Sequence, residues 1–253
     1  DHGGVLPRSK GYIYEAGLHV PLVIRFPEKY KHLFATAQGV REGGFVSFID
    51  FSPTVLNLAG LDIPESMDGN PFAGEGVTTE SLAARDEAFG YADRFDERYE
   101  FARSFRKGKY KYIRAYEHFY PDSLQNNYRY RMLAFSQWRE LNSKGELNEA
   151  QSHFFHAKPV ELLFDVEADP HEVVNLAGMA AHQSILEDLR SRLRVKMKQI
   201  NDLSLFPENQ MIDLALEDGI GFGRERSAEI EDLLDVVDLA LLPWEQARKK
   251  FQR

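Results

Sequence analysis

The first 80 residues show two apolar runs and one clear helix signal. Residues 20–27 (VPLVIRFP) form a short apolar run ending in proline, which predicts a buried strand in a sheet covered on both faces. A second apolar run, Phe45–Phe51, leads into Ser52-Pro53, a cap and a first-turn proline, and Gly60 is suited to end the helix. This alternation of strand, helix and loop predicts an α/β layered domain.

The pattern changes after about residue 85. Residues 101–105 and 109–116 predict an antiparallel hairpin that turns at Lys107-Gly108, and residues 161–165 predict a further strand. Apolar side chains recur every three or four positions over residues 181–200, which predicts a long amphipathic helix. This part of the chain is therefore expected to be a small antiparallel sheet carrying one long helix.

Two more helices are expected, near residues 129–143 and 226–242. The second lies in a segment of different composition, because residues 201–253 hold 12 acidic and 6 basic side chains. We therefore divide the chain into three parts: residues 1–88, residues 89–200, and an acidic, mainly helical extension over residues 201–253.

Composition excludes some classes of protein. A hydrophobic content of 43% with 18 phenylalanines supports a substantial core. The net charge of −9 argues against nucleic acid as the main partner. The chain has no cysteine, which excludes a disulfide, a thiolate metal site and a cysteine nucleophile within it, and no apolar run reaches the length needed to span a membrane.

Candidate chemistry is concentrated at the start of the chain. Asp1 and His2 are adjacent potential ligands of a hard cation, and the two glycines that follow let the backbone turn away. Lys10 is suited to holding a tetrahedral oxyanion, and Arg8 could add a bidentate contact. Taken alone, these residue types fit a polar loop end with a solvated lysine better than a site, and two metal ligands are too few.

Residues 93–114 form a second candidate region. They carry eight basic and four acidic side chains, a net of +4 in an acidic chain, which suits the binding of a polyanion. The alternative interpretation is a solvated face on which neighbouring charges offset one another.

Several motifs occur in one order along residues 1–200: D-H-G, L-P-R-x-K, Y-E-A-G, V-P-L-V-I-R-F-P, VSFIDFSPTVLNLAGLDIPESMDG and ELLFDVEADPHEVVNLA. Together they resemble the C-terminal part of the type I, formylglycine-dependent sulfatase family of the alkaline phosphatase superfamily. The stretch ADRFDERYEFARSFRKGKYKYIRAY is most similar to sulfatases of the N-sulfoglucosamine or heparan type.

The resemblance implies an α/β fold. Residues 1–88 would be the C-terminal part of an alkaline-phosphatase-like sandwich that forms the catalytic domain, and residues 89–200 the small C-terminal subdomain of antiparallel sheet and helix. The implied activity is hydrolysis of sulfate esters or sulfamates of a sulfated carbohydrate.

The resemblance also implies roles for single residues. Asp1 and His2 match ligands of Ca²⁺, with Mg²⁺ or Mn²⁺ as less favoured metals, and Lys10 matches a sulfate-binding residue, to which Arg8 could contribute. The remaining candidates would contact the substrate: Arg94, Asp96, Arg98 and Arg103.

The chain departs from the family pattern, since it lacks the family's early Asp-Asp pair, the His and Lys that precede D-H-G, and the nucleophile motif. The family nucleophile is a formylglycine made from cysteine or serine in a C/S-x-P-x-R motif, and neither form of the motif occurs here. We therefore expect a fragment that is inactive alone, whose partner is the missing N-terminal half of the same protein. The family further implies a periplasmic or secreted protein.

Two alternatives stay open. One is a phosphonate or phosphate monoester hydrolase of the same superfamily, in which D-H-G also binds metal. The other is a degenerate protein that only binds sulfated glycans.

Overall fold

The computed structural model describes residues 2–4 and 6–251. The chain forms two compact units. The first comprises Asp1–Val20, Phe89–Phe105 and Lys109–Arg253, and the second comprises Pro21–Ala88 and Arg106–Gly108.

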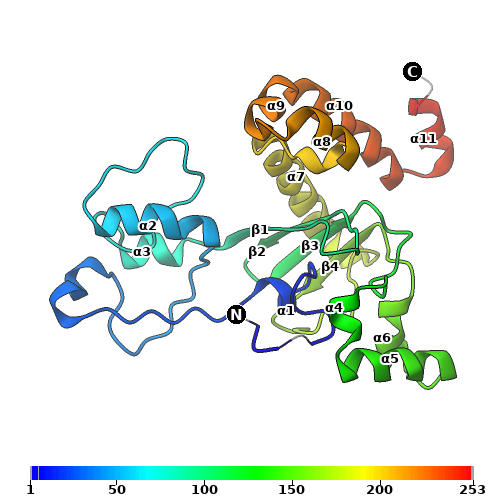
Figure 1. Ribbon diagram of the computed structural model, residues 1–253, viewed down its shortest axis with the longest axis horizontal. Helices are drawn as coiled ribbons and strands as arrows, with labels where there is room; N and C mark the ends of the chain where they lie inside the picture. The colour runs from blue at the N-terminus through cyan, green and yellow to red at the C-terminus, as the bar shows by residue number, and fades with distance from the viewer. Residues whose placement is uncertain (1, 5, 252–253) are drawn as a thin grey trace. The chain divides into compact units, whose positions relative to one another are not determined.

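A four-stranded sheet with the strand order β1-β2-β3-β4 is built largely from the first unit (Figure 1). Its strands are β1 (Glu87–Ala92), β2 (Ala102–Lys107), β3 (Tyr110–Ala115) and β4 (Glu161–Asp165). Strands β3 and β4 are antiparallel, with Tyr110 opposite Asp165 and Arg114 opposite Glu161. The predicted hairpin and the strand at residues 161–165 are therefore confirmed.

The long helix α7 (Gln183–Gln199) covers one side of the sheet's core. It begins two residues after the predicted start, because a 3₁₀ turn, Ala180–His182, precedes it. Four side chains three or four positions apart are buried on its inner face and share one hydrophobic cluster with side chains of the strands: Leu186, Leu189, Leu193 and Met197. The period of apolar residues thus identified both the helix and its buried face.

The acidic extension is helical, as predicted. It contains α8 (Glu208–Ala215), α9 (Gly219–Glu225), α10 (Ser227–Asp238) and α11 (Trp244–Phe251). Ile230 and Leu234 of α10 are almost fully buried in the same cluster as the inner face of α7. The extension therefore shares the hydrophobic core of the first unit.

A second cluster joins the N-terminal segment to the helices that follow β3. Tyr12, Ile13 and Tyr14 pack there with Phe135 and Phe154. The helix predicted near residues 129–143 is divided into α4 (Asn127–Tyr130) and α5 (Leu133–Lys144), with the short helix α6 (Glu149–Ser152) beyond them.

The second unit contains α2 (Phe51–Leu58) and α3 (Thr79–Ala83). The predicted helix is confirmed, but it begins at Phe51 with Asp50 at the N-cap position, so the prediction that Ser52 caps it is wrong. Gly60 follows the helix with a positive φ of 67°. Asp50 is buried before α2, where it pairs with Arg85 at 2.5 Å and accepts a hydrogen bond from the Ser47 amide at 2.8 Å.

The strand predicted at residues 20–27 is not formed, and this part of the prediction is wrong. The segment is irregular, and the Val23 side chain is 91% exposed. A strand exists only through hydrogen bonds to a neighbouring strand, and none of the four strands in the described residues pairs with it.

The fold class is mixed: helices are combined with an antiparallel four-stranded sheet.

The short helix α1 (Glu15–Leu18) ends the N-terminal segment. None of the helices in the described part of the chain is both long enough and apolar enough to cross a membrane.

Candidate functional site

The N-terminal segment that carries the candidate residues is anchored inside the first unit. The side chains of Tyr12, Ile13 and Tyr14 are 1–5% exposed. The Tyr14 hydroxyl donates a hydrogen bond of 2.6 Å to the carboxylate of Asp122, and the Tyr12 hydroxyl donates to the Asp122 carbonyl at 3.3 Å. The segment is therefore held from its buried side, directly after Lys10.

Of the two predicted metal ligands, the structure describes His2. Asp1 lies outside the described residues, whereas His2 has its Nε2 2.8 Å from the Gly17 carbonyl oxygen. A carbonyl only accepts, so Nε2 carries the proton and Nδ1 has the lone pair, the tautomer of a histidine that can bind metal through Nδ1. His2 therefore fits a single ligand, but residues 2–4 and 6–251 contain no group of three or more potential ligands placed to hold a metal ion.

Lys10 lies in a tight turn whose backbone is fixed from the side of α4. Its carbonyl oxygen accepts a hydrogen bond of 2.6 Å from Nη2 of Arg129. The next residue, Gly11, has a φ of 80°, a left-handed conformation that side chains disfavour. The half-buried Lys10 side chain thus extends from a defined backbone, and its sulfate-binding role stays a prediction.

Arg8 binds the protein itself. Its guanidinium donates to the carbonyls of His171 at 2.8 Å and Glu172 at 3.2 Å, and it lies 3.7 Å above the ring of Tyr14. These contacts fasten the N-terminal segment to the turn before residue 173. They give Arg8 a structural role, and a contact with sulfate stays a prediction.

A second set of contacts holds the N-terminal segment to the same turn. The buried ammonium of Lys111 pairs with Glu15 at 3.1 Å and Glu172 at 3.0 Å. Glu172 also accepts a 2.6 Å hydrogen bond from the Glu15 amide. No local pattern indicates this cluster, because its members lie up to 157 residues apart.

Behind Tyr12 and Tyr14 lies a buried network of four charged groups, which sequence reasoning also missed. Lys158 Nζ bridges the carboxylates of Glu100 at 2.8 Å and Asp122 at 2.9 Å, and Arg98 pairs with both. Although burial alone would raise it, Lys158 and Arg98 hold the pKa of Asp122 below its usual value. The network is therefore charged, and it supports the segment that carries Lys10.

The predicted substrate contact of Arg98 stays a prediction, and the structure gives this side chain partners within the protein. The side chain is 1% exposed and its charge is matched by Glu100 and Asp122. Within the described residues, this cation contacts the protein rather than solvent.

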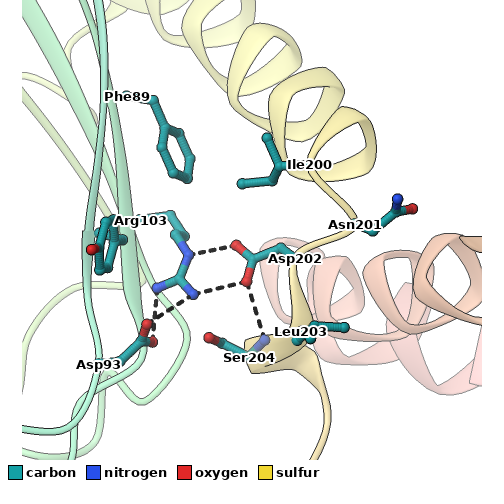
Figure 2. Close-up of a pocket in the computed structure, with 9 residues that line it drawn as sticks. Phe89, Asp93, Arg103, Ile200, Asn201, Asp202, Leu203 and Ser204 are labelled. Carbon is teal, nitrogen blue, oxygen red and sulfur yellow. Dashed lines mark hydrogen bonds and ion pairs between the residues drawn. The ribbon is translucent and has the colours of Figure 1, made fainter. Parts of the chain in front are cut away.

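Arg103 is likewise bound by carboxylates. Figure 2 shows its guanidinium between Asp93 and Asp202: Nε and Nη2 donate to Asp202 at 2.6 and 2.9 Å, and Nη1 donates to Asp93 at 2.9 Å. Burial raises the pKa of Asp93 despite the neighbouring arginine. Two carboxylates therefore surround one guanidinium, and the predicted substrate contact of Arg103 stays a prediction.

An open cavity of about 280 Å³ borders this cluster (Figure 2). Phe89 and the 65% exposed Tyr91 line it together with residues 200–204. It combines aromatic rings with a net negative set of polar groups, and none of the residues 2–14 is among its lining residues.

Arg94 and Asp96 are exposed, and Arg94 has other partners than the buried Arg98 and Arg103. Arg94 forms a bidentate pair with Glu208 of α8 at 2.6 and 2.8 Å, and its Nη1 donates to the Asp96 carbonyl at 3.4 Å. The three arginines among the predicted substrate contacts therefore belong to three separate sets of ion pairs. A substrate role for Arg94 and Asp96 stays a prediction.

Comparison with known proteins gives the following relatives. Residues 8–132 match the family described as N-sulphoglucosamine sulphohydrolase, C-terminal. An ulvan-active sulfatase of Formosa agariphila is 37% identical over 214 residues, which are 84% of this chain and 34% of that protein. The multifunctional alkaline phosphatase superfamily protein PehA of Trinickia caryophylli is 31% identical over 181 residues, 70% of this chain and 28% of that protein.

Among solved structures, a putative sulfatase of Bacteroides fragilis is 18% identical, with a TM-score of 0.37 over 64% of this chain and 27% of that one. The chain spans about a third of the length of the first curated relatives that it matches.

Proposed function

The chain belongs to the sulfatase family, and on that premise we propose that it is the C-terminal part of a sulfuric ester hydrolase acting on a sulfated carbohydrate. The observation that carries the proposal is the 37% identity to an ulvan-active sulfatase over 84% of the chain. The family match over residues 8–132 adds support, because it includes Lys10 and the residues that hold its turn.

Within this proposal, Lys10 binds the sulfate group. Its ammonium is a compact cation that neutralises charge on the sulfate oxygens. The backbone on which Lys10 stands is fixed by Arg129 and by the buried tyrosines after it. A charged group held in place before the substrate arrives binds the sulfate group in the ground state as well as in the transition state, so its loss should raise KM.

Ca²⁺ is the proposed metal, with Asp1 and His2 as two of its ligands. The ion would supply positive charge to the sulfate oxygens when bound. The hydrogen bond from His2 Nε2 to Gly17 leaves the other ring nitrogen as the metal-binding atom, which is the support that the described residues give. The remaining ligands and a formylglycine nucleophile would come from residues outside this chain.

The substrate is proposed to be a sulfated polysaccharide or a sulfated amino sugar. The relative's name points to ulvan, and the family description points to N-sulfated glucosamine. The linkage would accordingly be a sulfate ester or a sulfamate. A protein acting on such polymers would work in the periplasm or outside the cell.

A phosphate or phosphonate monoester hydrolase is the second candidate. It is favoured by the 31% identity to PehA, whose name assigns it to the alkaline phosphatase superfamily and calls it multifunctional. A protein that only binds sulfated glycans is the third, since the nucleophile lies outside these residues.

A substrate panel tests the proposal. The full-length protein containing this chain is purified with Ca²⁺ and given ulvan oligosaccharides, N- and O-sulfated glucosamine, and a phosphate monoester at equal concentrations. We expect release of sulfate from at least one sulfated sugar at a rate at least tenfold above release of phosphate. Faster phosphate release would establish the second candidate, and saturable glycan binding without release of either anion would establish the third.

The 253 residues alone provide the matched comparison. We expect them to release no sulfate above the background of their own Lys10→Ala variant, because the nucleophile is not among them. Turnover by this polypeptide would contradict the proposed division of the site.

A further inference from the structure

The turn after Lys10 is shaped around one buried arginine. Gly11 has a φ of 80°, and a Cβ atom at that position would collide with Nη2 of Arg129 and lie 3.0 Å from the ring of Phe95. Arg129 Nη2 donates its 2.6 Å hydrogen bond to the carbonyl of Lys10. The backbone of this turn and the guanidinium of Arg129 therefore fit together only with glycine between them.

Aromatic rings fix the guanidinium of Arg129 in this place. It lies 4.2 Å from the ring centre of Tyr12 and 4.5 Å from that of Phe95. The Asn126 side chain caps the start of α4 by accepting a 3.0 Å hydrogen bond from the Arg129 amide, and its Nδ2 donates to the Phe95 carbonyl at 3.1 Å. The side chain of Arg129 is thus held against the turn, and its backbone is held by Asn126.

Arg98 contacts the same turn and also lies over the Tyr12 ring. Its guanidinium lies 4.4 Å from the ring centre, and Nη1 donates a long hydrogen bond of 3.5 Å to the Gly11 carbonyl. Two consecutive carbonyls, those of Lys10 and Gly11, therefore accept hydrogen bonds from two buried arginines.

The two arginines differ in charge compensation. Arg98 pairs with Glu100 and Asp122, whereas Arg129 forms no ion pair within residues 2–4 and 6–251. The Arg129 side chain is 1% exposed, and its Nε and Nη1 have no hydrogen-bond partner among those residues. Burial lowers the pKa of Arg129, although the charges of Glu100 and Asp96 oppose this shift, which reflects the cost of burying a cation without a direct ion pair.

A buried cation with unused donors is costly, and such groups are retained where their charge or geometry serves a site. We propose that Arg129 is a positioning residue for Lys10: it fixes the Lys10–Gly11 turn and adds positive charge beneath it, so that Lys10 meets an anionic sulfate group in one orientation. This inference rests on the proposed function where it names sulfate as the anion.

A double-mutant cycle in the full-length protein tests this role. If Arg129 acts through Lys10, Arg129→Met should lower kcat/KM about 10- to 100-fold in the wild-type protein and less than about threefold in a Lys10→Ala background. Most of the loss should come from a higher KM. A smaller folded fraction lowers the apparent kcat and leaves KM unchanged, so the rise in KM distinguishes position from stability.

Arg114 offers a matched control. It is also a 2% exposed arginine that donates to backbone carbonyls, here those of Val160 and Val237, and its Nε likewise has no hydrogen-bond partner in the described chain. Arg114→Met should change kcat/KM by the same factor with and without Lys10. Equal factors for Arg129→Met in both backgrounds would overturn the inference.

Two further measurements test the inference if Arg129→Met does not fold. One is the KM of the Arg129→Lys variant, and the other is hydrogen exchange in the wild-type chain. Lysine keeps the charge but not the planar fork, so we expect Arg129→Lys to raise KM above the wild-type value, and no rise would count against positioning. In the wild-type 253 residues, the Tyr12 amide, which donates to the Ser9 carbonyl at 3.0 Å, should exchange slowly. Exchange at the rate of an unstructured loop would exclude a fixed turn.

The outcomes separate this inference from the proposed function. A full-length protein without sulfatase activity refutes the function, and the exchange measurement still tests the turn. An active protein in which Arg129→Met leaves KM unchanged refutes the inference alone.

Discussion

At the scale of single residues, the basic side chains of this chain are mostly bound to carboxylates or carbonyls. Arg98 and Arg103 looked like candidates for a polyanion site in a segment with a net charge of +4. Their carboxylate partners were not evident from the sequence, since Asp202 lies 99 residues after Arg103 and Asp122 lies 24 residues after Arg98. Charge counted along a segment therefore did not report the charge presented to a ligand.

Lys158 provides a prediction at this scale. Lys158→Met leaves Glu100 and Asp122 buried with one cation fewer, and it should lower the free energy of unfolding by about 3–5 kcal/mol. The measurement is urea unfolding of the 253-residue chain at pH 7. Lys144→Met, which breaks the exposed pair with Glu140, is the control and should cost less than about 0.5 kcal/mol. Equal effects of the two substitutions would contradict a compensated buried network.

The sequence indicated which N-terminal residues are suited to bind a metal or an anion, but it did not indicate which residues hold them in place. Lys10 stands in a constrained turn, and His2 has a tautomer that suits a metal ligand. The partners that create this setting, Arg129 and Gly17, could not be predicted, because the first is 119 residues away and the second acts through its backbone carbonyl.

At the scale of elements, local signals were reliable and nonlocal pairing was not. The apolar period predicted α7 to within two residues, and the serine–proline signal predicted α2. Residues 20–27 have the composition of a buried strand, yet they are irregular, because a strand depends on a neighbour that its own sequence does not specify.

Glu161 connects three elements and gives a pH prediction. From β4 it accepts two hydrogen bonds from Arg190 of α7, at 2.7 and 2.8 Å, and one from the Tyr112 hydroxyl of β3 at 2.6 Å. Although burial alone would raise it, Arg190 and Tyr112 hold the pKa of Glu161 below its usual value. The carboxylate therefore stabilises the fold above the unfolded-state pKa of about 4.3, and this contribution is lost as the pH falls through the lower folded-state pKa.

Urea unfolding of the 253-residue chain between pH 7 and pH 2.5 measures this contribution. Glu161→Gln should be less stable than the wild type at pH 7, and the difference should shrink as the pH falls below about 4. Glu140→Gln on the exposed side of α5 serves as the control, with little difference at any pH. A difference between wild type and Glu161→Gln that stays constant with pH would show that the carboxylate charge is not involved.

At the scale of the whole molecule, two compact units share a chain that covers about a third of its curated relatives. The first unit has a continuous core that extends from the sheet through α7 to α10. Along its N-terminal segment, the buried network, the Lys111 cluster and Arg129 converge on residues 8–15. A large share of the polar interior thus serves to hold the segment on which the proposed sulfate contact stands.

That contact is the central claim, and the Lys10→Ala variant tests it most directly. The measurement is kcat/KM for sulfate release by the full-length protein from the best substrate of the panel, with the melting temperature recorded in parallel. We predict a loss of at least about 100-fold at an unchanged melting temperature, because a positioned cation on the reacting group contributes about 2.7–4 kcal/mol. A Lys10→Ala protein that releases sulfate within threefold of the wild-type rate would contradict the account.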